Sequence, residues 1–231
     1  MIDRKCIQCG APITRHSKTG HCVHCGREVA LQTRKQRKRE ALNRLDPREE
    51  VYGHPTTLRY WDQHMDRKLH RDFDLESPLL DVGCGTGEKA FLWAVDGWEV
   101  SGFDISTWCI AKAAKHKREE SHLIKGSVDY TQADIVDHWP YADNAFMSLV
   151  CTDVLEHIIG YDSQHFFSEV WRVVVPGGRV LIVVPHGKAY WEERHIRTFE
   201  ANQVWVIGSR KLRDHHVEVR DDRLYLVGTV P

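Results

Sequence analysis

From about Pro78 onwards, short apolar segments alternate with segments that have helical spacing. Five apolar segments predict strands: "PLLDV", "WEVSGFDI", "VDYTQADI", "AFMSLVCTD" and "RVLIVVP". The segments between them predict helices: "GEKAFLWAV", "STWCIAKAAKHKREE", which Ser106 caps, and "SQHFFSEVWRVV". The last stretch, "HHVEVRDDRLYLVGTVP", reads as two further short strands around an Asp-Asp turn. This order is typical of an α/β protein: a mostly parallel, seven-stranded sheet with helices on both faces.

Three glycines at alternate positions, Gly83, Gly85 and Gly87, follow the first predicted strand. Glycine weakens regular structure, so the run needs a reason such as close approach of the backbone to a ligand. In parallel sheets the ligand lies beyond the carboxyl ends of the strands. A phosphate-binding P-loop does not fit, because Glu88 precedes the lysine, and a dinucleotide fingerprint does not fit, because Gly87 comes one residue early. Glu88 would repel a pyrophosphate, but not a ligand with a cationic centre and an amino group.

The run D-V-G-C-G-T-G closely resembles motif I of the class I, type-11-like S-adenosylmethionine-dependent methyltransferases, which have a Rossmann-like fold. The resemblance continues through "GFDIS", "QADIVDHWPYADNAFMSLVCTDVLEHI" and "VWRVVVPGGRVLIVVP". It implies that S-adenosylmethionine is the cofactor and that Asp104 accepts hydrogen bonds from both ribose hydroxyls. It also implies that Asp134 holds the adenine amino group with Ile135 beside the ring, and that Gly83 and Gly85 matter most for the methionyl part. The implied cofactor-binding residues are Asp81, Gly83, Cys84, Gly85, Gly87, Asp104, Ile105, Asp134, Ile135 and Cys151.

The residues after the fourth predicted strand bear on the methyl acceptor. Enzymes that methylate amino groups of nucleic-acid bases usually have an Asn/Asp-Pro-Pro-aromatic run here, whereas this chain has Cys151-Thr152-Asp153-Val154. Methylation of the adenine amino group is therefore disfavoured. Cys151 also lacks the Pro-Cys context of cytosine C5 enzymes, and we expect it to pack at the strand end.

The resemblance suggests four catalytic candidates. In "VLEHI", Glu156 and His157 stand where the family's short fourth helix begins and faces the acceptor, and His157 could act as a base near neutral pH. The alternative is a structural role that caps or supports the loop. "ERHIRTF" resembles a His-x-Arg-x-Phe element, which implies that His195 and Arg197 line the acceptor site. The helix that relatives carry after this loop is predicted to be truncated over residues 200–216.

Four cysteines near the start have the spacing C-x2-C-x12-C-x2-C: Cys6, Cys9, Cys22 and Cys25. Such paired knuckles suit a tetrahedral structural zinc site with no open position for catalysis. Residues 1–32 are thus predicted to form a zinc ribbon, which would obtain most of its folding energy from the metal. The alternative is four unrelated free cysteines.

Residues 33–46 are predicted to be a basic linker or helix. Residues 1–45 carry 11 basic and 3 acidic side chains, a net charge of +8, although the whole chain has a formal net charge of -1. A basic end on an acidic body suggests an arm that meets a polyanion, and the alternative is a solvated linker helix. Residues 47–231 are predicted to be the methyltransferase domain. The boundary is placed near Asp46-Pro47, because proline disfavours helix at the residue before it.

The composition also excludes some classes. No apolar run approaches the length of a membrane span, and no secretory signal is visible. Seven cysteines, four of them clustered, indicate metal binding in a reducing cytoplasm rather than a disulfide framework.

Three hypotheses on function remain at this point. The first is methylation of a nucleic acid, RNA rather than DNA, with the ribbon and basic arm docking the substrate. The second, alternative hypothesis is methylation of a small molecule or a protein, with the ribbon as a structural or protein-docking module. The third is a ribbon-type binding protein in which the cofactor domain is only a scaffold, against which the intact Asp81, glycine run and Asp104 count.

Overall fold

The computed structural model describes residues 69–158, 162–187, 198–220 and 222–231. All of them belong to the larger of the two units of the chain, Asp46–Pro231. The predicted zinc ribbon and basic segment lie outside the described residues and stay predictions.

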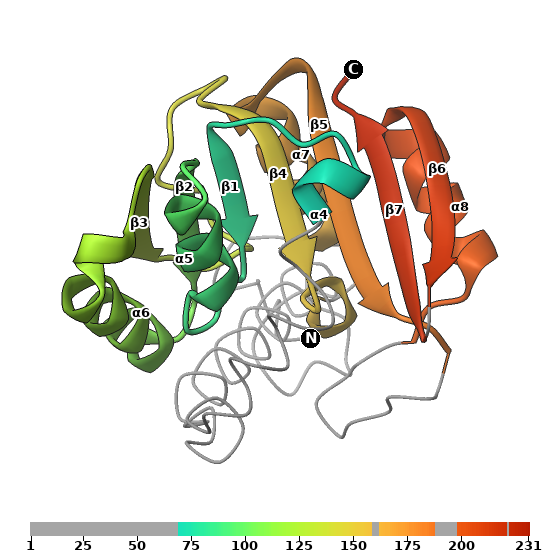
Figure 1. The fold of residues 1–231 in the computed structure, drawn as a ribbon. Helices are drawn as coiled ribbons and strands as arrows, with labels where there is room; N and C mark the ends of the chain where they lie inside the picture. Colours follow the sequence, from blue (N-terminus) through green and yellow to red (C-terminus); the bar gives the residue numbers. More distant parts are fainter. Residues whose placement is uncertain (1–68, 159–161, 188–197, 221) are drawn as a thin grey trace, which may run out of the picture. The chain divides into compact units, whose positions relative to one another are not determined.

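Seven strands form one sheet in the order β3-β2-β1-β4-β5-β7-β6 (Figure 1). Neighbours among β1 to β5 pair in parallel, whereas β7 runs antiparallel to both β5 and β6. The strands are β1 (Leu79–Val82), β2 (Glu99–Asp104), β3 (Ser127–Gln132), β4 (Phe146–Thr152), β5 (Val174–Pro185), β6 (Arg213–Arg220) and β7 (Arg223–Thr229). The sheet is therefore mixed, and the predicted mostly parallel, seven-stranded α/β sheet is confirmed. The link between β6 and β7 is too short for a crossover helix, which explains why these two strands are antiparallel.

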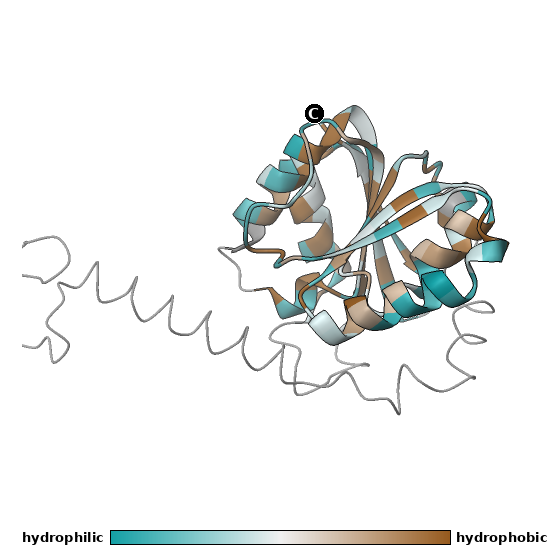
Figure 2. Cartoon of the chain, turned by 90° about the vertical axis from the view of Figure 1, so that its left-hand side faces the viewer, coloured by the Kyte–Doolittle hydropathy of each residue, from teal (hydrophilic) through white to brown (hydrophobic). Residues whose placement is uncertain are grey.

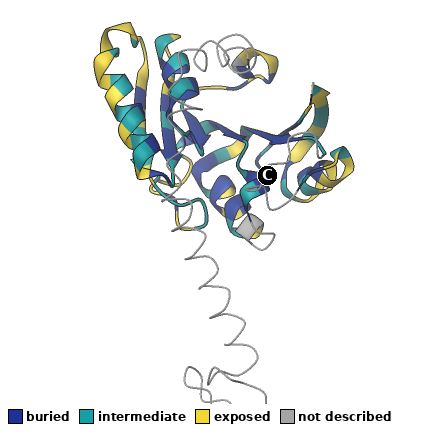
Figure 3. Cartoon of the chain, turned by 90° about the horizontal axis from the view of Figure 1, so that it is seen from below, coloured by how far each residue is buried: buried dark blue, intermediate teal, exposed yellow. Residues whose placement is uncertain are grey.

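Helices cover both faces of this sheet (Figure 1). Among the described residues, the helices of eight or more residues are α5 (Glu88–Val95), α6 (Thr107–Glu119), α7 (Asp162–Val173) and α8 (Ala201–Lys211), and α4 (Leu69–Asp72) is a single turn. One apolar core joins the sheet to α4 and α5, and a second joins its other face to α7 and α8. Hydrophobic residues recur along the strands (Figure 2), and buried residues concentrate in the sheet while exposed residues are frequent on the helices (Figure 3). The central strands read as continuous apolar runs because both their faces are buried.

The predicted cap of α6 is confirmed. The Ser106 hydroxyl accepts a hydrogen bond from the Cys109 amide at 3.2 Å, which satisfies one of the free amides of the first turn. This helix follows directly from the end of β2 and therefore fixes the direction in which the chain leaves the sheet edge.

We expect Ser106→Ala to lower the free energy of unfolding by about 1 kcal/mol, because the Cys109 amide loses its acceptor. Ser106→Gly is the control and should cost only a few tenths of a kcal/mol, roughly, since glycine is itself accepted at this position. Urea denaturation measures both. Equal losses for the two variants would contradict a capping role.

The prediction of a truncated helix after residue 200 is wrong. Helix α8 spans 11 residues, and the Glu200 amide donates to Gln203 Oε1 at 2.9 Å at its start. Local propensity hid this helix, because β-branched residues and Gly208 are weak helix formers. Packing explains the glycine: a Cβ on Gly208 would come within 2.6 Å of Leu226 on β7. Helix α8 therefore depends on tertiary contact with the sheet.

The sheet order defines where a ligand is expected. β1 lies between β2 and β4, so the chain leaves the sheet in opposite directions on the two sides of β1. Such a switch point opens the carboxyl edge of the sheet between the two crossovers. The glycine loop after β1 lies at this edge.

Candidate functional site at the carboxyl edge of the sheet

The loop after β1 adopts left-handed backbone conformations at all three glycines. Gly83, Gly85 and Gly87 have φ values of 70, 57 and 82°. A Cβ on Gly87 would come within 2.7 Å of the Tyr130 ring, and one on Gly83 would collide with Val154. A Cβ on Gly85 would meet no atom within 4 Å. Gly83 and Gly87 thus serve packing within the protein, whereas Gly85 alone of the three borders open space.

Asp104, the last residue of β2, holds this loop. Its Oδ2 accepts a hydrogen bond from the Gly85 amide at 3.0 Å, and its Oδ1 accepts one from the Ser106 amide at 2.8 Å. Burial raises the pKa of the Asp104 carboxyl, although these two amide donors oppose the shift. Each carboxylate oxygen can accept more than one hydrogen bond. Asp104 is partly exposed and lies beside the open Cβ position of Gly85, so its carboxylate retains capacity to accept further hydrogen bonds there.

Asp81, at the end of β1, has a different environment from the one expected of a cofactor contact. Its carboxylate is fully buried, and the Lys89 ammonium lies 3.4 Å from its Oδ1 and also donates to the Thr152 hydroxyl. Burial raises the pKa of Asp81, and the charge of Lys89 opposes this. The structure therefore pairs Asp81 with a helix residue rather than exposing it.

Lys89 and Thr152 were not among the predicted site residues. Lysine is seldom buried, so a lysine at the start of a helix gives no local sign of an internal ion pair. Thr152 stands 63 positions further along the chain. Only the meeting of α5, β1 and β4 brings the three side chains together.

Two predicted cofactor contacts, Cys84 and Cys151, are buried. The Cys84 thiol lies 3.7 Å from the Gly85 carbonyl oxygen, and Cys151 is fully buried in the core under α7. Burial raises the pKa of both thiols. Cys151 packs at the end of β4, as expected from the sequence. Neither cysteine is part of the site that we propose below.

The segment after β3 lies at the same edge as Asp104. The Ala133 amide donates to the Asp104 carbonyl oxygen at 3.1 Å, which fixes where this segment begins. The Asp134 carboxylate accepts from the Val136 amide at 3.1 Å, and Asp134 and Ile135 are both partly exposed. The structure therefore brings Asp104, Asp134 and Ile135 to neighbouring strand ends. Ile105, which follows Asp104, is also partly exposed.

On the acceptor side, the structure describes two of the four predicted catalytic residues. Glu156 and His157 lie in the 3-10 turn η2 (Leu155–His157) after β4, where Glu156 is buried and His157 is partly exposed. His195 and Arg197 lie outside the described residues, as do the predicted zinc ligands Cys6, Cys9, Cys22 and Cys25. Within the described ranges, no group of three or more metal-ligating side chains is arranged to hold a metal ion. No helix in the same ranges is long and apolar enough to cross a bilayer.

Asp153 connects β4 to this turn in a left-handed conformation, with φ of 57°. Arg223 on β7 holds its carboxylate, because Nη1 lies 2.6 Å from both Oδ1 and Oδ2. A left-handed backbone is unfavourable for residues with a Cβ, although Asp tolerates it better than most. The ion pair with Arg223 thus holds the residue at which the chain leaves β4 for the turn that carries Glu156 and His157.

Asp153→Ala and Asp153→Gly both remove the ion pair with Arg223, but only alanine keeps a Cβ in the left-handed conformation. We therefore expect the glycine variant to be more stable than the alanine variant by about 1 kcal/mol. Urea midpoints of the two variants measure this difference. A stability order in which alanine equals or exceeds glycine would show that the backbone relaxes at this position.

Comparison with known proteins shows what this domain is similar to. Residues 80–182 match a family described as "Methyltransferase domain". The chain is 30% identical over 146 residues to phosphoethanolamine N-methyltransferase 2 of Caenorhabditis elegans, covering 62% of this chain and 32% of that protein. It is 28% identical over 182 residues to a ubiquinone biosynthesis O-methyltransferase of Vibrio atlanticus (strain LGP32), covering 73% of this chain and 70% of that protein.

Solved structures agree on the fold. The PH0226 protein from Pyrococcus horikoshii OT3 superposes with a TM-score of 0.66 over 83% of this chain and 99% of that chain, at 18% identity. The glycopeptide N-methyltransferase MtfA, in its complex with S-adenosyl-L-methionine, has a TM-score of 0.59 over 73% of this chain and 96% of that chain, also at 18% identity. Residues 80–182 therefore match a methyltransferase domain, and the described residues share the fold of these solved structures.

Proposed function

We propose that the chain transfers a methyl group from S-adenosylmethionine to a small molecule. One observation carries the cofactor part of this proposal: the Asp104 carboxylate holds the Gly85 amide beside open space at the carboxyl edge of the sheet. The left-handed Gly85, whose Cβ position is open, lets a ligand approach the backbone closely, and an ionised carboxylate accepts strong hydrogen bonds from hydroxyl groups.

The residues at this edge fit the parts of the cofactor. Asp104 would hold the ribose hydroxyls, Asp134 the adenine amino group and Ile135 the face of the ring, with the methionyl part over Gly85. When bound, the cofactor supplies a methyl group on a positively charged sulfur. The protein's contribution is to orient the acceptor in line with that methyl group and to keep the geometry fixed.

The residues of η2 are candidates for the acceptor side. His157 is partly exposed after β4 and could remove a proton from a hydroxyl or amino acceptor near neutral pH. Glu156, the preceding residue, is buried, so it is better suited to support the turn than to contact an acceptor. His195 and Arg197 stay candidates by resemblance alone.

The comparisons favour the small-molecule alternative over the nucleic-acid expectation. Two relatives are named for phosphoethanolamine and for ubiquinone biosynthesis, and a structural neighbour for a glycopeptide. The nucleic-acid expectation came from residues 1–46, which lie outside the described part of the chain. We therefore propose a small acceptor, with residues 1–46 as a separate module.

Calorimetry with S-adenosylhomocysteine tests the cofactor site first, and absence of binding by the full chain would overturn the proposed function. Transfer of tritiated methyl groups from S-adenosylmethionine into a fractionated cell extract then tests the acceptor. Label in the small-metabolite fraction is expected. Label in the RNA, DNA or protein fraction would refute the small-molecule proposal while leaving the methyltransferase intact.

We further propose that Cys6, Cys9, Cys22 and Cys25 bind one structural zinc ion. Thiolates at this spacing suit a closed tetrahedral site. Metal analysis of the purified full chain should give one zinc per chain, and Cys6→Ser together with Cys9→Ser should abolish it. Zinc that stays bound in that double variant would contradict this ligand set.

A further inference from the structure

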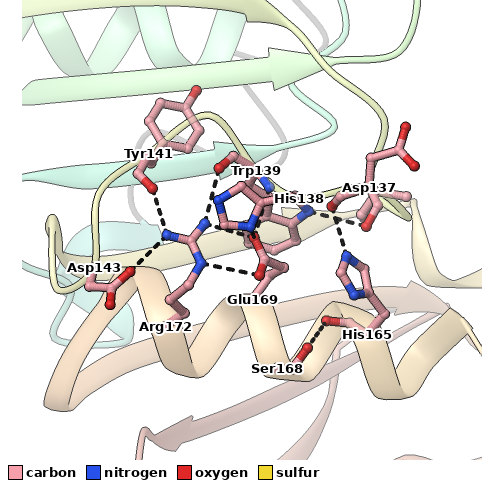
Figure 4. A network of polar contacts seen from close by, with 10 residues as sticks. Asp137, His138, Trp139, Tyr141, Asp143, His165, Ser168, Glu169 and Arg172 are labelled. Atoms are coloured by element: carbon pink, nitrogen blue, oxygen red, sulfur yellow. Dashed lines mark hydrogen bonds and ion pairs between the residues drawn. The ribbon is translucent and has the colours of Figure 1, made fainter.

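A polar network links helix α7 to the segment between β3 and β4 (Figure 4). We infer that the Arg172–Glu169 pair on α7 positions the adenine-binding residues Asp134 and Ile135 and so sets the selectivity for the adenine base. This inference rests on the proposed function, because it takes Asp134 and Ile135 as the adenine contacts.

All three guanidinium nitrogens of Arg172 donate hydrogen bonds, either to this segment or to Glu169 on the same helix. Nη1 donates to the Tyr141 carbonyl oxygen at 2.6 Å and to Asp143 Oδ1 at 3.0 Å. Nη2 donates to the Trp139 carbonyl oxygen at 3.0 Å and to Glu169 Oε2 at 2.7 Å, and Nε donates to Glu169 Oε1 at 3.1 Å. One side chain thus holds two backbone carbonyls, at Trp139 and Tyr141, in a fixed relation to α7.

Glu169 completes the clamp from the same helix. Its Oε2 also accepts from the Trp139 amide at 2.7 Å, so Trp139 is held at both its amide and its carbonyl group. Burial raises the pKa of the Glu169 carboxyl, but the hydrogen bonds from Arg172 and the Trp139 amide outweigh it and lower the pKa overall. The carboxylate therefore stays ionised at neutral pH and keeps its charge pairing with Arg172.

One face of α7 carries these anchors. His165, Glu169 and Arg172 are spaced i, i+4 and i+7, so they follow one another along the helix surface. His165 Nε2 lies 2.8 Å from the Asp137 carbonyl oxygen, which adds a contact closer to Asp134. The helix therefore holds the segment at residues 137, 139 and 141.

Trp139 connects Glu169 and Arg172 to the proposed adenine contacts. Its ring is fully buried, and its Nε1 donates to the Ile135 carbonyl oxygen at 3.1 Å. The ring also packs against Phe103, 5.1 Å between centroids, next to Asp104 in the chain. Residues 133–145 contain neither helix nor strand, so these contacts, together with the Val136 amide on the Asp134 carboxylate, hold Asp134 and Ile135 in place.

The consequence concerns recognition of the base rather than of the whole cofactor. Asp134 can distinguish the 6-amino group of adenine from the 6-oxo group of hypoxanthine only if its carboxylate is held in position. Loosening the segment should therefore weaken binding of the adenine compound more than binding of the hypoxanthine compound. A residue that merely stabilised the fold would not change this ratio.

Calorimetry of the full chain with S-adenosylhomocysteine and S-inosylhomocysteine measures the ratio of the two dissociation constants. We expect Arg172→Met to reduce the preference for the adenine compound about tenfold relative to the wild type, which corresponds to one hydrogen bond. Arg118→Met, at an exposed position on α6, is the matched control and should keep the wild-type ratio. Glu169→Gln is the second variant. Its side-chain oxygen can still accept a hydrogen bond from the Trp139 amide, so we expect the protein to fold and to lose less of its preference for the adenine compound than Arg172→Met.

The possible failures are distinct. If the wild type binds neither compound, the proposed function fails and the inference falls with it. If the wild type prefers the adenine compound and both variants keep that preference, or if the wild type binds the two compounds equally, the inference alone is overturned. Should Arg172→Met not fold, the ratio for Glu169→Gln decides.

Discussion

Lys89→Met is expected to lower the free energy of unfolding by about 3–5 kcal/mol. The substitution removes the ammonium that lies 3.4 Å from the Asp81 carboxylate and leaves this fully buried carboxylate without that charge. A buried charge without its partner costs more than the pair contributed, because its desolvation is no longer compensated. Chemical denaturation of the full chain measures the change.

Two further variants test the cause. The double variant Asp81→Leu with Lys89→Met removes both charges and should recover most of the loss, since apolar pairs often replace buried ion pairs without penalty. Lys115→Met removes an exposed partner of Glu119, where the side chains are 60% and 59% exposed, and should cost about 0.5 kcal/mol or less. A double variant as unstable as Lys89→Met would mean that packing, not charge, is lost.

The pH dependence of Lys89→Met has a definite sign. Burial already raises the pKa of Asp81, and removal of the lysine raises it further. A carboxyl with a higher pKa in the folded state binds more protons there than in the unfolded state, so stability falls as pH rises through that range. The deficit of the variant relative to the wild type should therefore shrink as the pH is lowered towards the pKa of Asp81.

Asp104→Asn is expected to weaken binding of S-adenosylhomocysteine about 100-fold. The carboxylate is the proposed acceptor for two ribose hydroxyls, and a hydrogen bond to a charged group contributes about 1.5–3 kcal/mol. Asparagine keeps one neutral acceptor and turns an amide donor towards the Gly85 or Ser106 amide, both of which now donate to Asp104. Calorimetry measures the loss of affinity, and denaturation checks that the variant folds.

The matched control is Asp129→Asn on the neighbouring strand β3. Its side chain is 79% exposed and pairs with Lys117, so the same substitution there should leave affinity unchanged. Affinity within threefold of the wild type for Asp104→Asn, roughly, would contradict the ribose role, because this is less than half a charged hydrogen bond.

Local patterns in the sequence account for much of the fold. The order of strands and helices follows from apolar runs and helical spacing, and Ser106 marks the start of α6. These signals work because each depends on residues that are neighbours in the chain. Helix α8 was missed for the opposite reason: Gly208 is a poor helix former, and contact with Leu226 compensates for it.

The candidate site divides in the same way. Asp104 and Gly85 could be predicted because they form part of a compact pattern at one strand end and one turn. The sequence did not distinguish Gly85, which borders open space, from Gly83, which faces Val154. It also gave no warning that Asp81 would be paired internally with Lys89.

The amino-acid sequence by itself determined the α/β class of the domain, the sheet edge at which the glycine loop lies and the chemical type of the residues there. Those features arise from short-range patterns, since a strand, a turn and a helix cap are each complete within a few residues. Only the tertiary structure decided which of those residues border open space and which are held by other parts of the protein. The pairing of Lys89 with Asp81 and Thr152, and the clamp of Arg172 and Glu169 on the segment after β3, join residues far apart in the chain. Such contacts depend on how the helices settle on the sheet, which no local pattern encodes.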